Sequence, residues 1–253
     1  MTSGADTRSG RSEILMGPRG CICRYDWGTA ISTRPASSDA ARNRGPACDS
    51  FRRQVTIAFM LCAVRRGILG GTFDPFHVVH LMAGEAARHM LDLDVITYIT
   101  AGDPYQKHGI PIADKDHRWA MTVLGIEGIG YFEADDREVK RTGPSYMIDT
   151  LDTFDEDEDI YLILGADAAV GLPSWHRWQD VVERTTVTVI SRPGVAEEEV
   201  AATGAPYNWL DTPGIPISST MLRARAEAGR SIRFFVPDAV WRYVEENRLY
   251  ELP

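Results

Sequence analysis

Residues 67–80 read GILGGTFDPFHVVH, and this stretch decides the fold. A short apolar run is followed by a pair of glycines, by Asp74 and Pro75, and then by residues that suit a helix. Glycine lets the backbone turn tightly, and Asp-Pro is typical of a helix start, so we expect a strand, a turn and a helix in direct succession. Asp74 is expected to cap that helix, whose exposed amide groups would then receive phosphate oxygens.

Outward from this stretch, short apolar runs alternate with helical patterns. We expect strands at 67–69, 95–100, 160–164 and 187–190, an extended segment at 131–133, and helices at 75–91, 116–124, 146–154, 178–183, 220–228 and 237–246. This alternation is typical of a parallel sheet covered by crossover helices. We therefore predict a doubly wound, Rossmann-like α/β domain over residues 63–253.

Residues 1–62 are rich in Gly, Ser, Arg, Ala and Pro and show no sustained periodicity. This composition favours a disordered, Arg-rich extension, while a targeting segment and a gene start placed upstream of Met60 are two further interpretations that stay open. All four cysteines lie in this region, and their spacing indicates unpaired thiols rather than a disulfide framework or a metal site. A reducing cytoplasm fits this usage.

The charge of the chain is uneven. Residues 1–66 contain eleven Arg and no Lys against five acidic residues, whereas the whole chain has a formal net charge of −9. The remainder is therefore strongly acidic and would repel a phosphate backbone, so nucleic acid is not an expected partner. No apolar run is long enough to cross a bilayer, so we expect no membrane partner. Association into a homo-oligomer is left open.

His77 and His80 are spaced one helical turn apart and should project from the same side of the predicted helix. Both are then able to donate a hydrogen bond to one anionic group. The alternative, a metal-binding pair, would need a third ligand, and no residue has a spacing that points to one, so no protein metal site is predicted. The glycine pattern also differs from the G-x-G-x-x-G fingerprint of dehydrogenases.

A second segment, ISSTMLR at 217–223, completes a pattern that resembles the nucleotidylyltransferase superfamily. Members of that superfamily open with G-G-x-F-D-P-x-H-x-G-H and carry I-S-S-T-x-x-R later in the chain. Ser219 or Thr220 would cap a helix whose amides face phosphate, and Arg223 would stabilise charge on phosphoryl oxygens. The resemblance implies an ATP site formed by Gly70, Gly71, Thr72, Phe73, His80, Asp167, Ser219, Thr220 and Arg223.

Further segments are similar to the nicotinate mononucleotide adenylyltransferase family, and together the resemblance covers about residues 67–250. They are DPYQK at 103–107, DHR at 116–118, RTGPSY at 141–146, DTL at 149–151, GAD at 165–167, SW at 174–175 and the close at 232–250. The form of 103–107 is nearest to actinobacterial members. The resemblance implies transfer of the adenylyl group of ATP, with Mg²⁺, to nicotinate mononucleotide, giving nicotinate adenine dinucleotide and pyrophosphate.

The same resemblance implies roles for single residues. His77, His80, Arg223 and Lys107 would be catalytic, and the carboxylate of Asp167 would accept hydrogen bonds from ribose hydroxyls at the carboxyl end of a strand. The residues expected to bind the mononucleotide are Lys107, Ser145, Tyr146, Met147, Trp175, His176 and Arg192. Trp175 would stack on the pyridine ring, although a Trp packed in the core is the competing interpretation.

Three positions depart from the family pattern: Val79 replaces a glycine, Met147 a threonine and His176 a tyrosine. The phosphate-handling residues are intact, so we expect activity. Pantetheine-phosphate adenylyltransferase and nicotinamide mononucleotide adenylyltransferase are alternatives within the same class. A nucleotide-binding regulatory module without catalysis is the alternative from another class.

Overall fold

The computed structural model describes residues 14–16, 22–24, 63–107, 109 and 112–250. The chain divides into two units, Met1–Cys62 and Ala63–Pro253. In the first unit, β1 (Ile14–Met16) pairs antiparallel with β2 (Ile22–Arg24), a pair that the composition did not indicate. The prediction of disorder for the rest of residues 1–62 lies outside the described residues.

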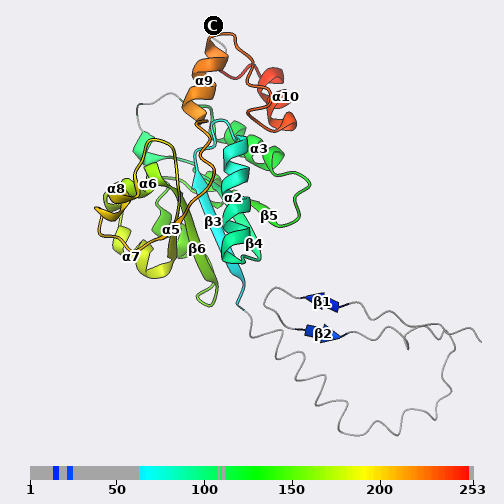
Figure 1. The fold of residues 1–253 in the computed structure, drawn as a ribbon. Helices are drawn as coiled ribbons and strands as arrows, with labels where there is room; N and C mark the ends of the chain where they lie inside the picture. Colours follow the sequence, from blue (N-terminus) through cyan, green and yellow to red (C-terminus); the bar gives the residue numbers. More distant parts are fainter. Residues whose placement is uncertain (1–13, 17–21, 25–62, 108, 110–111, 251–253) are drawn as a thin grey trace, which may run out of the picture. The chain divides into compact units, whose positions relative to one another are not determined.

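The second unit is built on a six-stranded sheet, drawn as arrows in Figure 1. Its strands are β3 (Arg65–Gly71), β4 (Val95–Thr100), β5 (Phe132–Asp135), β6 (Asp159–Gly165), β7 (Thr186–Ile190) and β8 (Asn208–Leu210). The spatial order is β5-β4-β3-β6-β7-β8, and every neighbouring pair is parallel. The order reverses between β3 and β6, which confirms the predicted doubly wound fold and places a ligand crevice at their carboxyl ends.

Helices connect the strands of this sheet, and two further helices follow its last strand. The connecting helices are α2 (Val78–Leu91), α3 (Lys115–Gly125), α4 (Arg137–Lys140), α5 (Met147–Leu151), α6 (Ala166–Val170), α7 (Trp178–Arg184) and α8 (Glu197–Ala201), with 3₁₀ turns η2 (Tyr105–Lys107) and η3 (Leu172–Ser174), and the two that follow are α9 (Ser219–Glu227) and α10 (Asp238–Glu246). None of the helices in the described part of the chain is long and apolar enough to cross a membrane.

The predicted elements agree with the structure except at some ends. The helix expected at 75–91 begins only at Val78, because the Asp74-Pro75 segment continues the turn after β3. The helix expected at 146–154 is confined to Met147–Leu151. The sequence pattern missed α4, α6, α8 and β8, which are too short to show a clear period.

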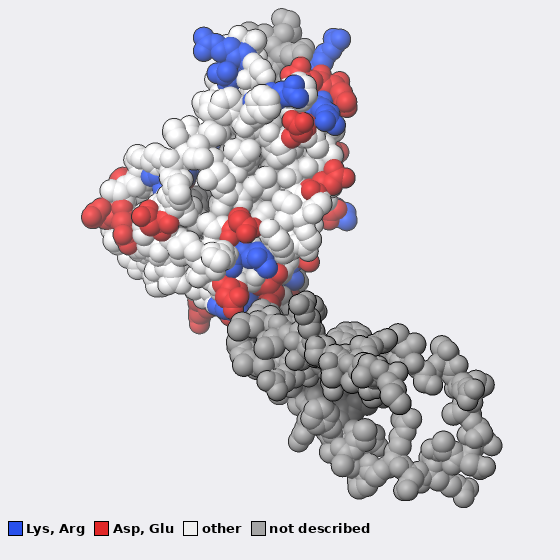
Figure 2. All heavy atoms as spheres, turned by 45° about the vertical axis from the view of Figure 1, so that its right-hand side comes forward, with Lys and Arg blue, Asp and Glu red and all other residues white. Residues whose placement is uncertain are grey.

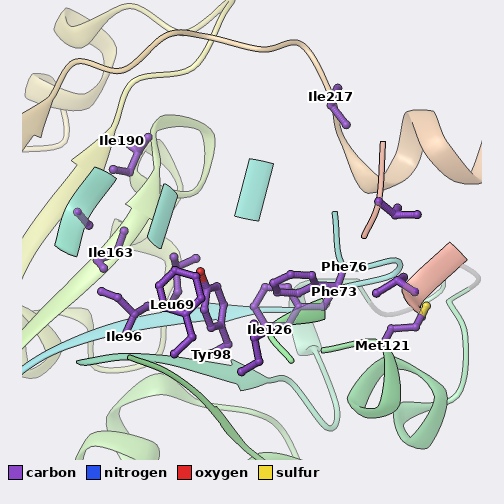
Figure 3. Close-up of a cluster of buried hydrophobic side chains, with 14 of the residues drawn as sticks. Leu69, Phe73, Phe76, Ile96, Tyr98, Met121, Ile126, Ile163, Ile190 and Ile217 are labelled. Atoms are coloured by element: carbon purple, nitrogen blue, oxygen red, sulfur yellow. The ribbon is translucent and has the colours of Figure 1, made fainter. Parts of the chain in front are cut away.

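The core lies on both faces of the sheet. Within β3, Leu69 faces one apolar cluster and Ile68 the other, and within β6 Ile163 and Leu162 divide in the same way. Burial on both faces explains why these strands read as continuous apolar runs rather than alternating ones. Figure 3 shows Leu69 and Ile96 beside Tyr98, with Phe73 and Phe76 next to them on the turn that follows β3.

Charged side chains on the face shown in Figure 2 gather toward the edges of the second unit, with a broad uncharged band between them. No extended field of Lys and Arg from the described residues crosses this face. The distribution therefore gives no support, on this face, for a surface that would attract a nucleic acid backbone.

Candidate active site

The turn after β3 brings the glycine pair into the crevice. Phe73 follows with a left-handed backbone (φ 51°), and its ring is 2% exposed. A Cβ added to Gly71 would lie 2.8 Å from that ring, so only glycine fits beside it. The buried Phe73 ring thus packs against the turn, and the two glycines line the crevice without side chains of their own.

His77 and His80 stand at the start of α2. His77 is the N-cap residue, and the two imidazole rings are stacked, with centroids 3.7 Å apart and an interplanar angle of 17°. The His77 backbone N–H donates to Nδ1 of His80 at 3.1 Å. Nδ1 of His80 is therefore an acceptor, and in the neutral ring Nε2 carries the hydrogen. The predicted pairing of these side chains on one side of the helix is confirmed.

Both imidazoles are neutral at physiological pH. Burial, aided by the charge of Arg192, lowers the pKa of His77 to about 3. Burial also lowers the pKa of His80 well below its ordinary value, and His77, Arg192 and Lys107 act in the same direction. Each ring then presents a single N–H to a ligand, while the positive charge of the crevice resides on Lys and Arg.

Asp74 does not cap α2, which corrects the sequence-based expectation. Its side chain is fully buried and accepts a hydrogen bond from the hydroxyl of Tyr250 at 2.7 Å. The backbone N–H of Ala113 donates to it at 3.3 Å, and Nη1 of Arg223 lies 3.5 Å from its Oδ2. The expectation failed because the turn directs this carboxylate into the domain, four residues before the helix begins.

The segment 217–223 meets this turn. Ser218, not Ser219 or Thr220, caps α9, since its Oγ accepts from the N–H of Met221 at 3.2 Å. The hydroxyl of Ser219 instead donates to the carbonyl of Pro75 at 3.0 Å. Thr220 Oγ1 accepts from Nη2 of Arg223 at 3.4 Å. The cap lies one residue earlier than predicted, so the next hydroxyl is free to join the two motifs.

Asp167 lies just after β6, as predicted, and is paired with Arg192. Nη1 of Arg192 donates to both carboxylate oxygens of Asp167, at 2.9 and 3.0 Å, and Nη2 donates to the carbonyl of Ile217 at 3.3 Å. A Cβ on Gly165 would lie 2.8 Å from Oδ1 of Asp167, so the preceding glycine makes room for this carboxylate. Arg192 thus lies with the second motif.

Two adjoining cavities occupy the crevice. The larger, of about 1020 Å³, is lined by eight of the residues predicted to bind ATP, namely Gly70, Gly71, Thr72, Phe73, His80, Asp167, Ser219 and Thr220, and also by His77, Arg192 and Val79. Arg223, also predicted to bind ATP, lines neither cavity. The smaller, of about 120 Å³, is lined among others by Tyr105, Glu138, Ser145, Met147 and Leu164. Six residues line both cavities, so the two spaces meet at them: Gly70, Gly71, Thr72, Gln106, Lys107 and Trp175.

The smaller cavity contains part of the predicted mononucleotide site. Met147 lies against the glycine turn, because a Cβ on Gly70 would be 2.9 Å from its Cε. Trp175 is half-buried and lines both cavities, so it is available to a ligand ring. Tyr146 and His176 do not line this cavity; their rings stack on each other with centroids 4.3 Å apart. Arg192 is likewise absent from its lining and borders only the larger one.

Lys107 belongs to η2 and lies between the cavities. Burial lowers its pKa, and the charge of Arg223 acts in the same direction, while Asp74 opposes both. Lys107 is therefore close enough to Arg223 for the two charges to affect each other. Two nearby positive groups with only the buried Asp74 carboxylate between their charges favour the binding of phosphate.

Sequence reasoning missed the role of Arg118, although the surrounding DHR segment had contributed to the resemblance. Its side chain is 1% exposed and donates to the carbonyl oxygens of Thr72, Ala101, Gly102 and Ala113. It therefore fastens the glycine turn to the loop that carries Lys107. A charged residue inside an amphipathic helix pattern gives no signal of such burial, so only the structure could reveal it.

Glu138 was also missed. Its carboxylate is 4% exposed, lines the smaller cavity and accepts from Thr150 Oγ1 at 2.6 Å. Burial raises its pKa, against the opposing effect of hydrogen bonds from Thr150 and Ser145.

Among the described residues, no group of three His, Cys, Asp or Glu side chains could hold a metal ion.

Comparison with known proteins agrees with this geometry. A family model described as cytidylyltransferase-like matches residues 68–225. A probable nicotinate-nucleotide adenylyltransferase of Roseiflexus sp. is 41% identical over 192 residues, covering 73% of this chain and 96% of its own. One of Listeria welshimeri is 40% identical over 189 residues, again covering 73% and 96%.

The fold is found in solved structures. A Plasmodium falciparum nicotinic acid mononucleotide adenylyltransferase complexed with NaAD has a TM-score of 0.62 and 19% sequence identity, covering 74% of this chain and 97% of its own. At that identity the likeness concerns the fold alone, whereas the two bacterial relatives are close enough to define the family. The chain belongs to the nicotinate-nucleotide adenylyltransferase family of cytidylyltransferase-like proteins.

Proposed function

We propose that this enzyme transfers the adenylyl group of ATP to nicotinate mononucleotide, with release of pyrophosphate. The observation that carries the proposal is the pair of adjoining cavities that share the glycine turn and Lys107. The larger contains the stacked histidines and the start of α9, as a triphosphate requires, and the smaller offers Trp175 to an aromatic ring. The reacting phosphates would meet between them.

The reaction joins two phosphates without a change in protonation. A phosphate oxygen of the mononucleotide attacks the α-phosphorus of ATP, forming one P–O bond as the bond from the α-phosphorus to the bridging oxygen breaks. The electron pair leaves on pyrophosphate. Because the nucleophile is already anionic near neutral pH, no general base is required, and catalysis consists of positioning and electrostatic stabilisation.

The chain supplies that stabilisation through neutral and charged donors. N–H groups of His77 and His80 would bind the α-phosphate as negative charge builds up in the transition state. Arg223 would hold a phosphate of ATP, and Lys107 would hold the phosphate of the mononucleotide. Mg²⁺ would enter with the ATP substrate and would neutralise part of the charge on its phosphates, without needing a set of protein ligands.

The finer features of the assignment are part of this proposal. The strongly acidic composition of the second unit and the use of small phosphorylated substrates favour an enzyme of the cytoplasm that binds no nucleic acid and no membrane. The form of residues 103–107 favours kinship with actinobacterial members. Assembly into a homo-oligomer is compatible with each of these features.

Pyrophosphate release tests the proposal directly. The purified chain is incubated with MgATP and, in parallel, with nicotinate mononucleotide, nicotinamide mononucleotide or phosphopantetheine. Preferential release with nicotinate mononucleotide is expected. Release only with one of the other acceptors would retain the reaction class and discard the substrate, while ATP binding without release would favour the regulatory module.

A further inference from the structure

Asp74 has an unusual position for a carboxylate. It is fully buried and forms an ion pair with Arg223, whose Nη1 lies 3.5 Å from its Oδ2, and its charge also raises the pKa of Lys107 and of Arg118 against the effect of burial. Nη1 of Arg223 also donates to the backbone carbonyl of Asp74 at 2.8 Å. A buried anion among cations lowers their mutual repulsion and fixes their direction.

One neutral group completes this cluster. The Tyr250 hydroxyl donates to Oδ1 of Asp74 at 2.7 Å, across 176 positions of the chain. Burial and the carboxylate raise the pKa of Tyr250 above its ordinary value, so the hydroxyl stays protonated and remains a donor. The distance is typical of a hydrogen bond to a charged acceptor, which is stronger than one between neutral groups.

The backbone around Tyr250 has an uncommon conformation where it places this hydroxyl beside Asp74. Arg248 and Tyr250 both adopt left-handed conformations, with φ values of 51° and 66°. Such conformations are unfavourable for residues with side chains and persist where surrounding contacts compensate for them. The Tyr250 ring also packs against the main apolar cluster, next to Met121, which provides part of that compensation.

We propose that Tyr250 is a positioning residue of the adenylyl-transfer site: its hydroxyl orients the Asp74 carboxylate, and that carboxylate sets the Arg223 guanidinium toward the phosphates of ATP. Residues 247–250 are thereby a part of the nucleotide site, although Tyr250, Asp74 and Arg223 all lie behind the lining of the two cavities. The inference rests on the proposed function only in that Arg223 is taken to contact ATP.

The variant Tyr250→Phe removes the hydroxyl and keeps the ring. Its matched control is Tyr243→Phe, which removes a hydroxyl that lies 2.9 Å from Nδ1 of His117, away from the catalytic turn. Affinity for a non-hydrolysable ATP analogue is measured, followed by KM for each substrate. Tyr250→Phe should bind the analogue about fivefold or more weakly, and its KM for nicotinate mononucleotide should change less than about twofold. Tyr243→Phe should behave as wild type.

A double-mutant cycle distinguishes positioning from general loosening of the fold. If Tyr250 acts through Arg223, the loss caused by Tyr250→Phe disappears in an Arg223→Ala background. An equal loss in both backgrounds, an equal loss in Tyr243→Phe, or unchanged analogue binding would each overturn the inference. Asp74→Asn, which preserves the size of the side chain, should reproduce the loss and serves if Tyr250→Phe does not fold. Since analogue binding needs no acceptor, a wrong acceptor would leave these results interpretable.

Discussion

His77 makes the free energy of unfolding depend on pH, and the size of this effect follows from its burial. Its side chain is 2% exposed, and its pKa in the folded protein is lowered from 6.5 to about 3. The unfolded chain therefore binds a proton at pH values where the native imidazole does not. The contribution of the neutral His77 ring to the free energy of unfolding is fully present above about pH 6.5 and is lost progressively as the pH falls toward 3.

The magnitude is large enough to measure. Between about pH 7.5 and about pH 5, one such histidine lowers the free energy of unfolding by about 2 kcal/mol, since each unit of displacement below the unfolded pKa corresponds to about 1.4 kcal/mol. The substitution His77→Asn removes this titrating group and retains a residue type that suits the N-cap position. The free energy of unfolding of the variant should fall by about 2 kcal/mol less than that of wild type between these two pH values.

Urea denaturation of both proteins at the two pH values provides the measurement, because groups that titrate equally in both cancel in the difference. His89→Asn, the same change at an exposed position of α2, is the control and should follow wild type. If His77→Asn lost as much stability as wild type, to within about 0.5 kcal/mol, the argument that His77 is held neutral by burial would be refuted.

Three further outcomes are expected. His80→Ala should lower kcat for pyrophosphate release about 10²- to 10³-fold, the usual cost of removing a donor to developing charge, and a normal kcat would exclude that role. Arg118→Met leaves its carbonyl acceptors unpaired and should lower the free energy of unfolding by about 3 kcal/mol or more, seen as a fall in Tm of roughly 6–12 °C; a shift below about 2 °C would contradict the buried contacts. Gly70→Ala places a methyl group 2.9 Å from Cε of Met147, a residue of the smaller cavity, and should raise KM for nicotinate mononucleotide several-fold. An unchanged KM would show that the pyridine ring does not bind beside Met147.

Much of the fold was predictable because the strands are strongly apolar and the helices between them are long. The strand at 95–100 was predicted with its observed bounds, and α3, α7 and α10 lie within one residue of their predicted limits. The helices α4, α6 and α8 and the strand β8 escaped prediction, since three to five residues contain too little periodicity to distinguish a regular element from a loop. Ends of elements depend on contacts that pattern alone does not contain.

The candidate site divides in a similar way. The glycine turn and the placement of His77 and His80 on the same side follow from spacing, because residues one turn apart on a helix are neighbours, whereas the stacking of their rings is a finding of the structure. The direction of Asp74 does not follow from spacing, and the cap of α9 is Ser218 rather than the neighbouring hydroxyls. Spacing also does not reveal that Arg192 pairs with Asp167 in the larger cavity.

The sequence by itself determined the order of the longer strands and helices and the family, because these depend on local preferences and on motifs of adjacent residues. Only the tertiary structure decided which side chains are buried and what they contact. Asp74 and Tyr250, 176 positions apart, illustrate the reason. Whether a carboxylate caps a helix or anchors a cluster of cations depends on which distant groups the folded chain brings within hydrogen-bonding distance.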